Sequence, residues 1–318
     1  MKAVLIREFG SPEVLRLEEV DKPVISNDEV LIRVHYSSVN PVDWKIRNGS
    51  ARFFYDSKFP MVLGFDVAGD IVDTGSSVTR FKKGDRAFGM LNYKRRGAYA
   101  EYACAKEENL AHFPDNLDFK EASAIPLAGL TAYQALYYRG KIKSGESVLI
   151  NGASGGVGSF GVQIAKAAGA TVTAICGTDN IELVKILGAD KVIDYRKEDF
   201  TKLPDKYDII FDAVGKLSFF RVSKNLKDSG RYITTLPDKV DIFSFFLTSF
   251  LTLFGYSKKS TFVGVKPSGS DLNSMSSLIK EKKLFPVIDR VFTMEQIREA
   301  HAYSETGHAR GKIVIKVF

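Results

Sequence analysis

Cysteine is almost absent from this chain of 318 residues, which contains Cys104 and Cys176 and no others. Each of the two lies inside an apolar, strand-like run. A disulfide scaffold and a Cys-rich zinc lobe both need more cysteines than this, so the sequence excludes them. The simpler interpretation is a pair of buried free thiols in a reducing compartment.

Long apolar segments are also missing. Residues 1–8 show neither an extended apolar stretch nor a small-residue cleavage site, so we predict no secretory signal and a cytoplasmic location. The longest aromatic and aliphatic segment, residues 242–254, is shorter than the roughly 20 residues that a membrane-spanning helix needs.

The charge balance is modest, with 45 Lys and Arg against 38 Asp and Glu, a net charge of +7. The basic residues are scattered, and the tightest run is residues 94–96. This distribution favours a solvated surface with small anionic partners, and we predict no nucleic-acid binding. The 45% hydrophobic content excludes a disordered chain, and the length fits one large or two medium domains.

The first part of the chain is typical of antiparallel β structure. Short apolar or β-branched runs, separated by Gly, Pro, Asn and Asp, predict strands at residues 4–6, 14–17, 30–34, 65–72, 86–88 and 98–103. These strands indicate a small barrel-like domain.

From about residue 120 the pattern changes to strands that alternate with helices. We predict strands at residues 147–150, 171–176, 192–194, 207–214 and 230–235, with helices at 156–168, 180–187 and 218–226. Gly169 and Gly188 stand just past two of the helices, where a left-handed residue is needed. Alternating units of this length specify a doubly wound parallel sheet and an α/β fold class.

The C-terminal region carries a capping box, Thr293 to Gln296, that predicts the start of a helix. A final strand at residues 312–317 is more like the N-terminal β domain than the alternating block. We therefore expect the chain to return to its first domain at the end.

The most informative segment is a strand that leads into a glycine-rich turn and then a helix, at residues 147–158. With Ala153, Gly155 and Gly158 in register, this arrangement brings a dinucleotide pyrophosphate onto a helix N-terminus. A literal G-x-G-x-x-G at Gly156, Gly158 and Gly161 begins too far into the helix to meet the phosphates.

The same letters also fit a G-x-S-x-G nucleophile elbow around Ser154, with Asp212 and His301 following in hydrolase order. A serine hydrolase is therefore the alternative. It is disfavoured because no HGGG-like loop precedes the turn, Gly158 has no role in an elbow, and a long β domain comes first.

At this point the sequence resembles the medium-chain dehydrogenase/reductase superfamily, in its zinc-free quinone oxidoreductase and enone reductase branch. The resemblance rests on residues 40–45, 64–69, 129–132, 153–158, 192–195 and 307–312. It implies a GroES-like β-barrel domain at residues 1–123 and 266–318, a Rossmann dinucleotide-binding domain at residues 124–265, and a substrate cleft where they meet.

Zinc can be examined independently. Where zinc-dependent relatives carry a Cys and a His-Glu pair, this chain has Asn40 and the pair Phe65 and Asp66. The four histidines, His35, His112, His301 and His308, are too scattered to suggest a ligand set. We therefore expect no metal.

Without a metal to polarise a carbonyl, a conjugated acceptor is easier to reduce because the incoming charge spreads onto an oxygen. This favours hydride transfer to quinones or α,β-unsaturated carbonyls. By resemblance, the catalytic residues are Asn40, Lys45 and Thr131. No general acid stands out, so solvent can supply the proton. The cofactor-binding residues assigned are Ser154, Gly155, Gly156, Val157, Gly158, Gly177, Thr178, Asn180, Tyr195, Val214, Gly215 and Lys312.

NADPH is the preferred cofactor on two grounds, with NADH still possible. The strand at residues 171–176 ends without the acidic residue typical of NAD sites, and Tyr195 matches a tyrosine that similar reductases place against the 2′-phosphate. Asp179 and Asn180 weaken this prediction, because relatives often have Arg or Lys there. A non-catalytic NADPH-binding sensor is a further alternative.

The aromatic segment at residues 241–256 is costly to leave in water. We expect it to cover the substrate cleft or a homodimer interface. Peripheral membrane contact, helped by Lys258 and Lys259, is the less favoured alternative. The substrate itself depends on loops around Phe53, Phe54 and Tyr55 and is not specified by the sequence.

Overall fold

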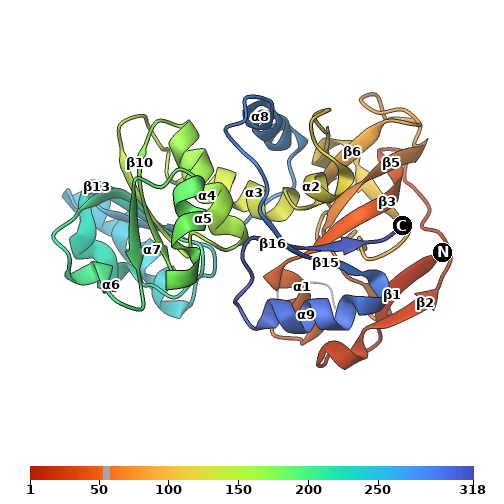
Figure 1. Ribbon diagram of the computed structural model, residues 1–318, viewed down its shortest axis with the longest axis horizontal. Helices are drawn as coiled ribbons and strands as arrows, with labels where there is room; N and C mark the ends of the chain where they lie inside the picture. The colour runs from red at the N-terminus through yellow and green to blue at the C-terminus, as the bar shows by residue number, and fades with distance from the viewer. Residues whose placement is uncertain (53–57) are drawn as a thin grey trace. The chain divides into compact units, whose positions relative to one another are not determined.

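The computed structural model describes residues 1–52 and 58–318, which form two compact units (Figure 1). The first unit comprises Met1–Leu130, Lys266–Glu281 and Pro286–Phe318, and the second comprises Thr131–Val265 and Lys282–Phe285. The loop of Phe53, Phe54 and Tyr55, predicted to shape the substrate pocket, lies outside the described residues.

The first unit is built on two mostly antiparallel sheets. The larger sheet has the order β15-β16-β3-β5-β6-β8, with β7 also pairing with β3. Its strands are β3 (Glu29–Val39), β5 (Asp66–Thr74), β6 (Arg86–Met90), β7 (Tyr102–Lys106), β8 (Leu110–His112), β15 (Ile288–Thr293) and β16 (Lys312–Lys316). The smaller sheet consists of β2 (Arg16–Glu19), β1 (Lys2–Ile6) and β4 (Met61–Val62).

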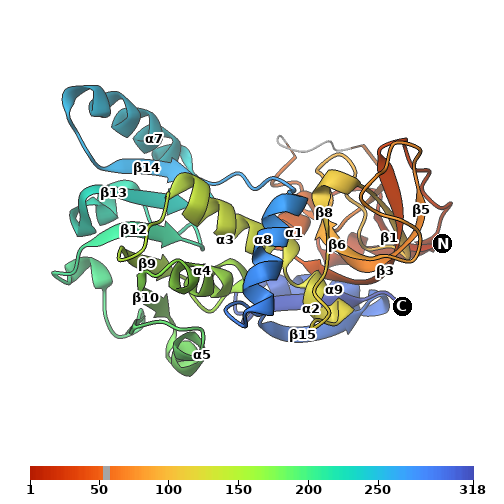
Figure 2. The same ribbon diagram turned by 90° about the horizontal axis from the view of Figure 1, so that it is seen from above.

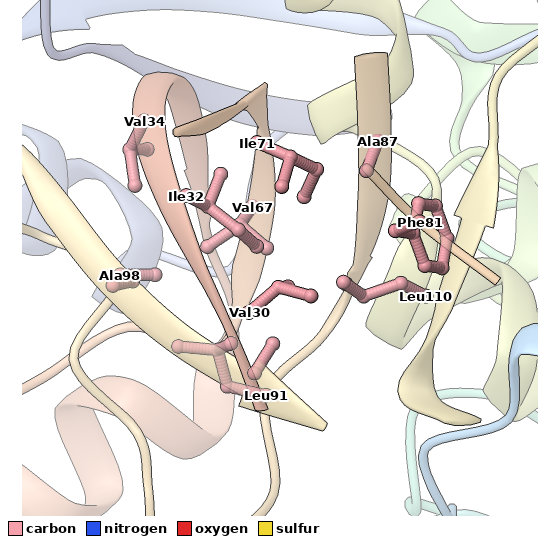
Figure 3. Close-up of a cluster of buried hydrophobic side chains, with 12 residues drawn as sticks. Val30, Ile32, Val34, Val67, Ile71, Phe81, Ala87, Leu91, Ala98 and Leu110 are labelled. Atoms are coloured by element: carbon pink, nitrogen blue, oxygen red, sulfur yellow. The ribbon is translucent and has the colours of Figure 1, made fainter. Parts of the chain in front are cut away.

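The core of this unit lies between the strands of the larger sheet. Figure 3 shows the side chains of Val30, Ile32, Val67 and Ile71 pointing toward one another from β3 and β5, with Phe81 packed at one side. Alternate residues of each strand point to the same face, so the apolar half of the alternation becomes this core.

The C-terminal strand returns to the first unit as predicted. β16 pairs antiparallel with β3, with Ile313 opposite Val39. The predicted capping box of Thr293 and Gln296 is also present, and the chain continues through a single 3-10 turn into α9 (Ile297–Glu305). The other helices here are α1 (Pro41–Arg47), α2 (Phe119–Ser123) and α8 (Gly269–Lys280), and α3 (Pro126–Gln134) runs on into the second unit.

The second unit contains a parallel sheet of the order β11-β10-β9-β12-β13-β14 (Figure 2). Its strands are β9 (Ser147–Asn151), β10 (Thr171–Cys176), β11 (Lys191–Asp194), β12 (Tyr207–Asp212), β13 (Leu226–Thr234) and β14 (Lys259–Phe262). Its helices are α4 (Gly156–Ala167), α5 (Ile181–Ile186), α6 (Phe219–Val222) and α7 (Lys239–Leu251). This strand order is that of a Rossmann sheet and confirms the predicted α/β, doubly wound class.

Predictions of single elements were confirmed where a residue type has a specific backbone conformation and were less accurate elsewhere. Gly169 and Gly188 have positive φ values of 80° and 101°, as expected of residues that end α4 and α5. The strand predicted at residues 98–103 is wrong in position, because β7 begins at Tyr102 and Ala100 makes only an isolated bridge to Ala3.

Candidate functional site

Asn40 and Lys45 belong to α1 in the first unit. Asn40 is the N-cap residue of this helix, and its backbone N–H donates to Asp43 Oδ2 at 2.8 Å. Pro41 follows at the first helical position, where its missing N–H costs nothing. These local features fix the direction in which Asn40 leaves the backbone.

The Asn40 side chain is enclosed by two charged groups. Its Nδ2 donates to Asp66 Oδ2 at 2.8 Å, and its Oδ1 accepts from Lys312 Nζ at 2.5 Å. Lys312 is 3% exposed, and its Nζ also lies 3.3 Å from Asp66 Oδ2 and 3.4 Å from the Val39 carbonyl oxygen. The ammonium predicted to bind the cofactor is thus buried inside this unit, where it acts on Asn40 and Asp66.

Asp66 uses both carboxylate oxygens. Oδ2 accepts from Ser38 Oγ at 2.5 Å in addition to Asn40, and Oδ1 accepts from the Leu127 backbone N–H at 2.8 Å. A buried carboxylate is tolerated only when it is paired and hydrogen-bonded in this way. Burial nevertheless lowers the pKa of Lys312, and the nearby Asp66 and Asp43 oppose that shift.

This arrangement does not fit zinc. Asn40 and Asp66 occupy the positions that the resemblance assigned to zinc ligands, and Lys312 places a positive charge between them. Zinc prefers thiolate, imidazole and carboxylate donors, and a neighbouring ammonium would repel it. Among the described residues no group of three or more His, Cys, Asp or Glu side chains converges on one point.

Asp43 is a second buried acid in this cluster. Its Oδ2 accepts from Tyr99 Oη at 3.0 Å as well as from the Asn40 N–H, while its Oδ1 has no hydrogen-bond partner in the described part of the chain. Desolvation, with a smaller contribution from Asp66, raises the pKa of Asp43 to about 7. Asp43 can therefore exchange a proton near neutral pH.

Lys45 is half-buried on the same helix, next to the Trp44 ring. Burial lowers the pKa of its ammonium. No ion pair to a described carboxylate opposes this shift. A lysine in this situation gives up its proton more readily than an ordinary surface lysine.

The second unit presents the predicted glycine-rich turn at the N-terminus of α4. Gly155 is the N-cap, and an added Cβ there would meet nothing nearer than the Gly152 carbonyl oxygen at 3.5 Å. At Gly158, by contrast, a Cβ would lie 2.1 Å from that same oxygen. The backbone is therefore closely packed at Gly158 and free of neighbouring atoms at Gly155. Such a turn lets a phosphate approach the helix N-terminus. Ser154, Gly156 and Val157 complete this turn.

Gly161 has a different role. A Cβ on this residue would come within 3.3 Å of the Ile150 and Phe211 side chains, so it allows α4 to pack closely on the sheet. This supports the register that begins at Ala153 over the literal G-x-G-x-x-G.

Asp212, at the end of β12, holds the neighbouring loop. It accepts from Asn151 Nδ2 at 2.8 Å and from the backbone N–H groups of Val214, Gly215 and Leu217 at 2.7–3.2 Å. Val214 and Gly215, both predicted cofactor residues, are thereby fixed at the same sheet edge as the turn. Thr131, the third predicted catalytic residue, is buried in α3.

A third group of predicted residues lies at the ends of β10 and β11. Thr178 Oγ1 donates to Asp194 Oδ2 at 2.5 Å, and Asn180 has a buried Oδ1 with no partner among the described residues. A Cβ on Gly177 would lie 3.4 Å from the hydroxyl of Tyr195, which is itself exposed. These residues therefore form one small cluster.

Arg196 belongs to this cluster and was missed by the sequence analysis. Its Nη1 donates to Asp179 Oδ2 at 3.2 Å, and its guanidinium carbon would lie 3.6 Å from a Cβ on Gly177. The cation absent at residues 179–180 is thus supplied by the turn that follows β11, and it compensates the charge of Asp179. The sequence feature that could have identified Arg196 is its position directly after Tyr195, a predicted cofactor-binding residue.

The hydrolase alternative finds no support in these contacts. His301 belongs to the first unit, where it is completely buried with Nδ1 3.2 Å from Arg47 Nη1. Burial and that guanidinium lower the pKa of His301 to about 3. Asp212 is occupied by the loop described above, so neither group is available to activate Ser154.

Comparison with known proteins assigns families to both parts of the chain. Residues 26–115 match the alcohol dehydrogenase GroES-like domain, and residues 187–315 match the zinc-binding dehydrogenase family. The structure of the quinone oxidoreductase from Coxiella burnetii has a TM-score of 0.90 at 32% identity and covers 100% of this chain and 99% of its own. The predicted combination of a GroES-like and a Rossmann domain is confirmed.

Two curated relatives extend the comparison. Quinone-oxidoreductase QR1, chloroplastic, of Triphysaria versicolor is 39% identical, with 99% of this chain and 98% of the relative covered. NADPH-dependent alkenal/one oxidoreductase, chloroplastic, of Arabidopsis thaliana is 38% identical, with 99% of this chain and 79% of the relative covered.

The cytoplasmic location predicted from the N-terminus is contradicted by these relatives, since both are named as chloroplastic proteins. The first residues of this chain are therefore a poor guide to where it resides. In the part of the chain that the structure describes, every helix is too short or too polar to cross a membrane.

Proposed function

This chain belongs to the quinone and enone oxidoreductase branch of the medium-chain dehydrogenase/reductase superfamily, and we propose that it reduces quinones or α,β-unsaturated carbonyls with NADPH and without zinc. One observation carries the proposal: the Lys312 ammonium lies where zinc-dependent relatives gather metal ligands. Since these residues do not fit a metal that would polarise an isolated carbonyl, a conjugated acceptor is the more suitable substrate.

The second unit supplies the groups for the cofactor. The backbone N–H groups of Gly156 and Val157 suit the pyrophosphate, because they are the first two of α4 and a helix N-terminus attracts phosphate. Gly155 keeps the turn free of side-chain atoms, and its own N–H donates to the Gly152 carbonyl oxygen at 3.1 Å. Tyr195 and Arg196 suit the 2′-phosphate, because a guanidinium forms strong charge-assisted hydrogen bonds with it. When bound, the reduced nicotinamide supplies a hydride.

The first unit supplies the proton and the fixed dipoles. Hydride arrival at the β-carbon of an enone leaves an enolate oxygen that must be stabilised and then protonated. Lys45 Nζ can do both, since its lowered pKa eases release of the proton. Asn40 is held rigid by Asp66 and Lys312, and it therefore acts as a preorganised polar group rather than a mobile one.

The test is a spectrophotometric screen of NADPH oxidation against a panel of quinones and enones. We expect acceptor-dependent oxidation, with kcat lowered about 10²-fold or more in Lys45→Met. Lys83→Met, which removes an exposed lysine in the same unit, should be unaffected. If no acceptor on the panel causes NADPH oxidation, the result would point to the sensor. Ester hydrolysis that is lost in Ser154→Ala would point to the hydrolase.

Cofactor preference provides a separate prediction. Arg196→Ala should raise KM for NADPH about tenfold or more and leave NADH almost unchanged, because a hydrogen bond to a charged group contributes about 1.5–3 kcal/mol. Arg221→Ala is the matched control, as this residue is also exposed in the second unit and paired with an acid, Asp199. Equal effects on both cofactors would place the 2′-phosphate elsewhere.

A further inference from the structure

Helix α7 has its polar side chains buried and its apolar side chains exposed, the opposite of an ordinary surface helix. Its buried residues, Asp241, Ser244 and Thr248, are all small and polar. Ser244 Oγ lies 2.7 Å from Ser260 Oγ, and Thr248 Oγ1 accepts from the Ser260 backbone N–H at 3.1 Å. The polar side of α7 is therefore the side that packs on β14. Figure 2 shows the helix lying beside that strand.

The opposite side of α7 and the 3-10 turn that follows it, Thr252–Phe254, carry an apolar stripe, which we define as Phe243, Phe246, Phe250, Leu253 and Phe254. Phe246 is 65% exposed, Phe250 is 58% exposed and Leu253 is 79% exposed. Spacings of three and four residues place Phe243, Phe246 and Phe250 on one face of α7, and Leu253 and Phe254 follow in the 3-10 turn. No charged residue occurs from residue 242 to residue 257. Within its own unit the stripe has two ring contacts, Phe243 with Phe220 at 6.4 Å and Phe246 with Phe245 at 5.3 Å between centroids. These contacts leave most of its apolar surface exposed.

The charges at the C-terminal end of the stripe are basic. Lys258 and Lys259 follow it after three uncharged residues, and Arg139 and Lys259 line a cavity of about 240 Å³ beside Phe245. Arg231, on the same cavity, is neutralised by Glu146 at 2.8 Å, whereas no described carboxylate pairs with Arg139 or Lys259. The pocket therefore offers uncompensated positive charge next to apolar rings.

We propose that α7 docks on the surface of an anionic lipid bilayer, with the apolar stripe among the acyl chains and with Arg139 and Lys259 at the headgroup phosphates. A helix of 13 residues lies along an interface and does not span it. The charges select this occupant over a second copy of the chain, since another copy brings the same basic groups and no phosphate. The inference does not depend on the proposed reaction.

Flotation of the purified protein with vesicles tests this. We expect it to float with vesicles that contain phosphatidylglycerol and to bind vesicles of phosphatidylcholine alone at least several-fold more weakly. The double variant Phe246→Glu with Phe250→Glu should lose flotation, and Arg139→Glu with Lys259→Glu should reduce it about as much as removal of the anionic lipid does.

Ile186→Glu is the matched control, because it places the same charge at an exposed apolar residue on α5 of the same unit. It should float like the parent protein. Retained NADPH oxidation, or an unchanged circular dichroism spectrum, shows that each variant is folded. Failure of the parent protein to float with anionic vesicles would overturn the proposal. So would a dimer in sedimentation that dissociates in the Phe246→Glu, Phe250→Glu variant, since a second copy would then occupy the stripe.

Discussion

Charged side chains usually lie on the surface of a protein and apolar side chains in its interior. The cluster around Lys312 in the first unit departs from the first rule, and the apolar stripe in the second unit departs from the second. The cluster buries a lysine and two acids, and the stripe exposes phenylalanines. In the cluster, Asn40, Asp66 and Lys312 satisfy one another, and Asp43 is bonded to Asn40 and Tyr99. The stripe makes ring contacts with Phe220 and Phe245, but most of its apolar surface stays exposed. Buried charged groups that find their partners within the same unit stabilise the fold. Exposed apolar groups that the same unit does not cover point to a partner outside it.

The two regions should therefore respond differently to substitution. Charged groups inside a protein lose their hydration and regain it only through specific partners, so removal of one partner harms the others. Exposed apolar groups lose little when they are removed, because they contribute little to the folded monomer. Substitutions in each region can break or sharpen the comparison.

Lys312→Met gives the largest expected effect. It leaves the Asp66 carboxylate buried without its cation, and loss of one partner of a buried pair costs about 3–5 kcal/mol of unfolding free energy. Urea denaturation of the parent and the variant measures this. Lys316→Met, an exposed lysine on the same strand, is the control and should change stability by less than about 0.5 kcal/mol.

Adding Asp66→Asn to Lys312→Met should recover part of the loss, since the orphaned charge is then gone. If Lys312→Met alone stays within about 1 kcal/mol of the parent, the cluster is not the internally satisfied unit described here.

These two regions also show where sequence reasoning ends. The strand at residues 171–176 was predicted with the bounds of β10, because a β-branched run follows Gly169, whose positive φ of 80° ends the preceding helix. The buried position of Lys312 was not foreseen. Lysine is almost never fully buried, and its partners Asn40 and Asp66 are remote in sequence. The pairing of β16 with β3 and of β3 with β5 brings these residues together.

Helix α7 was left without an assigned structure for a different reason. Its apolar residues are too continuous to show a helical period. A local signal was present, since Asp238 and Asp241 form a capping box at its start, with the Asp241 N–H donating to Asp238 Oδ1 at 2.8 Å. Arg196 was missed because its partner Asp179 lies on a different strand connection, which sequence spacing does not reveal.

The pH dependence of stability gives the second prediction. The pKa of Asp43 is about 7 in the folded protein and about 3.9 in an unfolded chain. Between these values the folded state holds a proton that the unfolded state has released. Stability from Asp43 is therefore fully present below about pH 4 and falls as pH rises toward 7, by up to about 1.4 kcal/mol per pH unit.

His301 acts in the opposite sense. Its pKa of about 3 lies below the unfolded value, so its contribution is present above about pH 6.5 and is lost as pH falls. Asp43→Asn should therefore give a steeper rise of stability with pH than the parent protein shows. Urea denaturation across this range measures the two slopes, with Asp73→Asn as the exposed control. Parallel slopes would mean that Asp43 is ionised in the folded protein.

The smallest effect is expected on the apolar stripe. Phe246→Ser removes a ring that is 65% exposed and contacts Phe245 at 5.3 Å between centroids, so the unfolding free energy should change by no more than about 0.5 kcal/mol. Phe88→Ser, at a completely buried ring, should cost about 3–5 kcal/mol in the same assay. Both variants are measured by urea denaturation at two protein concentrations and without lipid. A loss above about 1 kcal/mol for Phe246→Ser that does not depend on concentration would show that the ring is already covered by this chain in solution. The stripe would then be satisfied internally like the Lys312 cluster, and the contrast between the two regions would disappear.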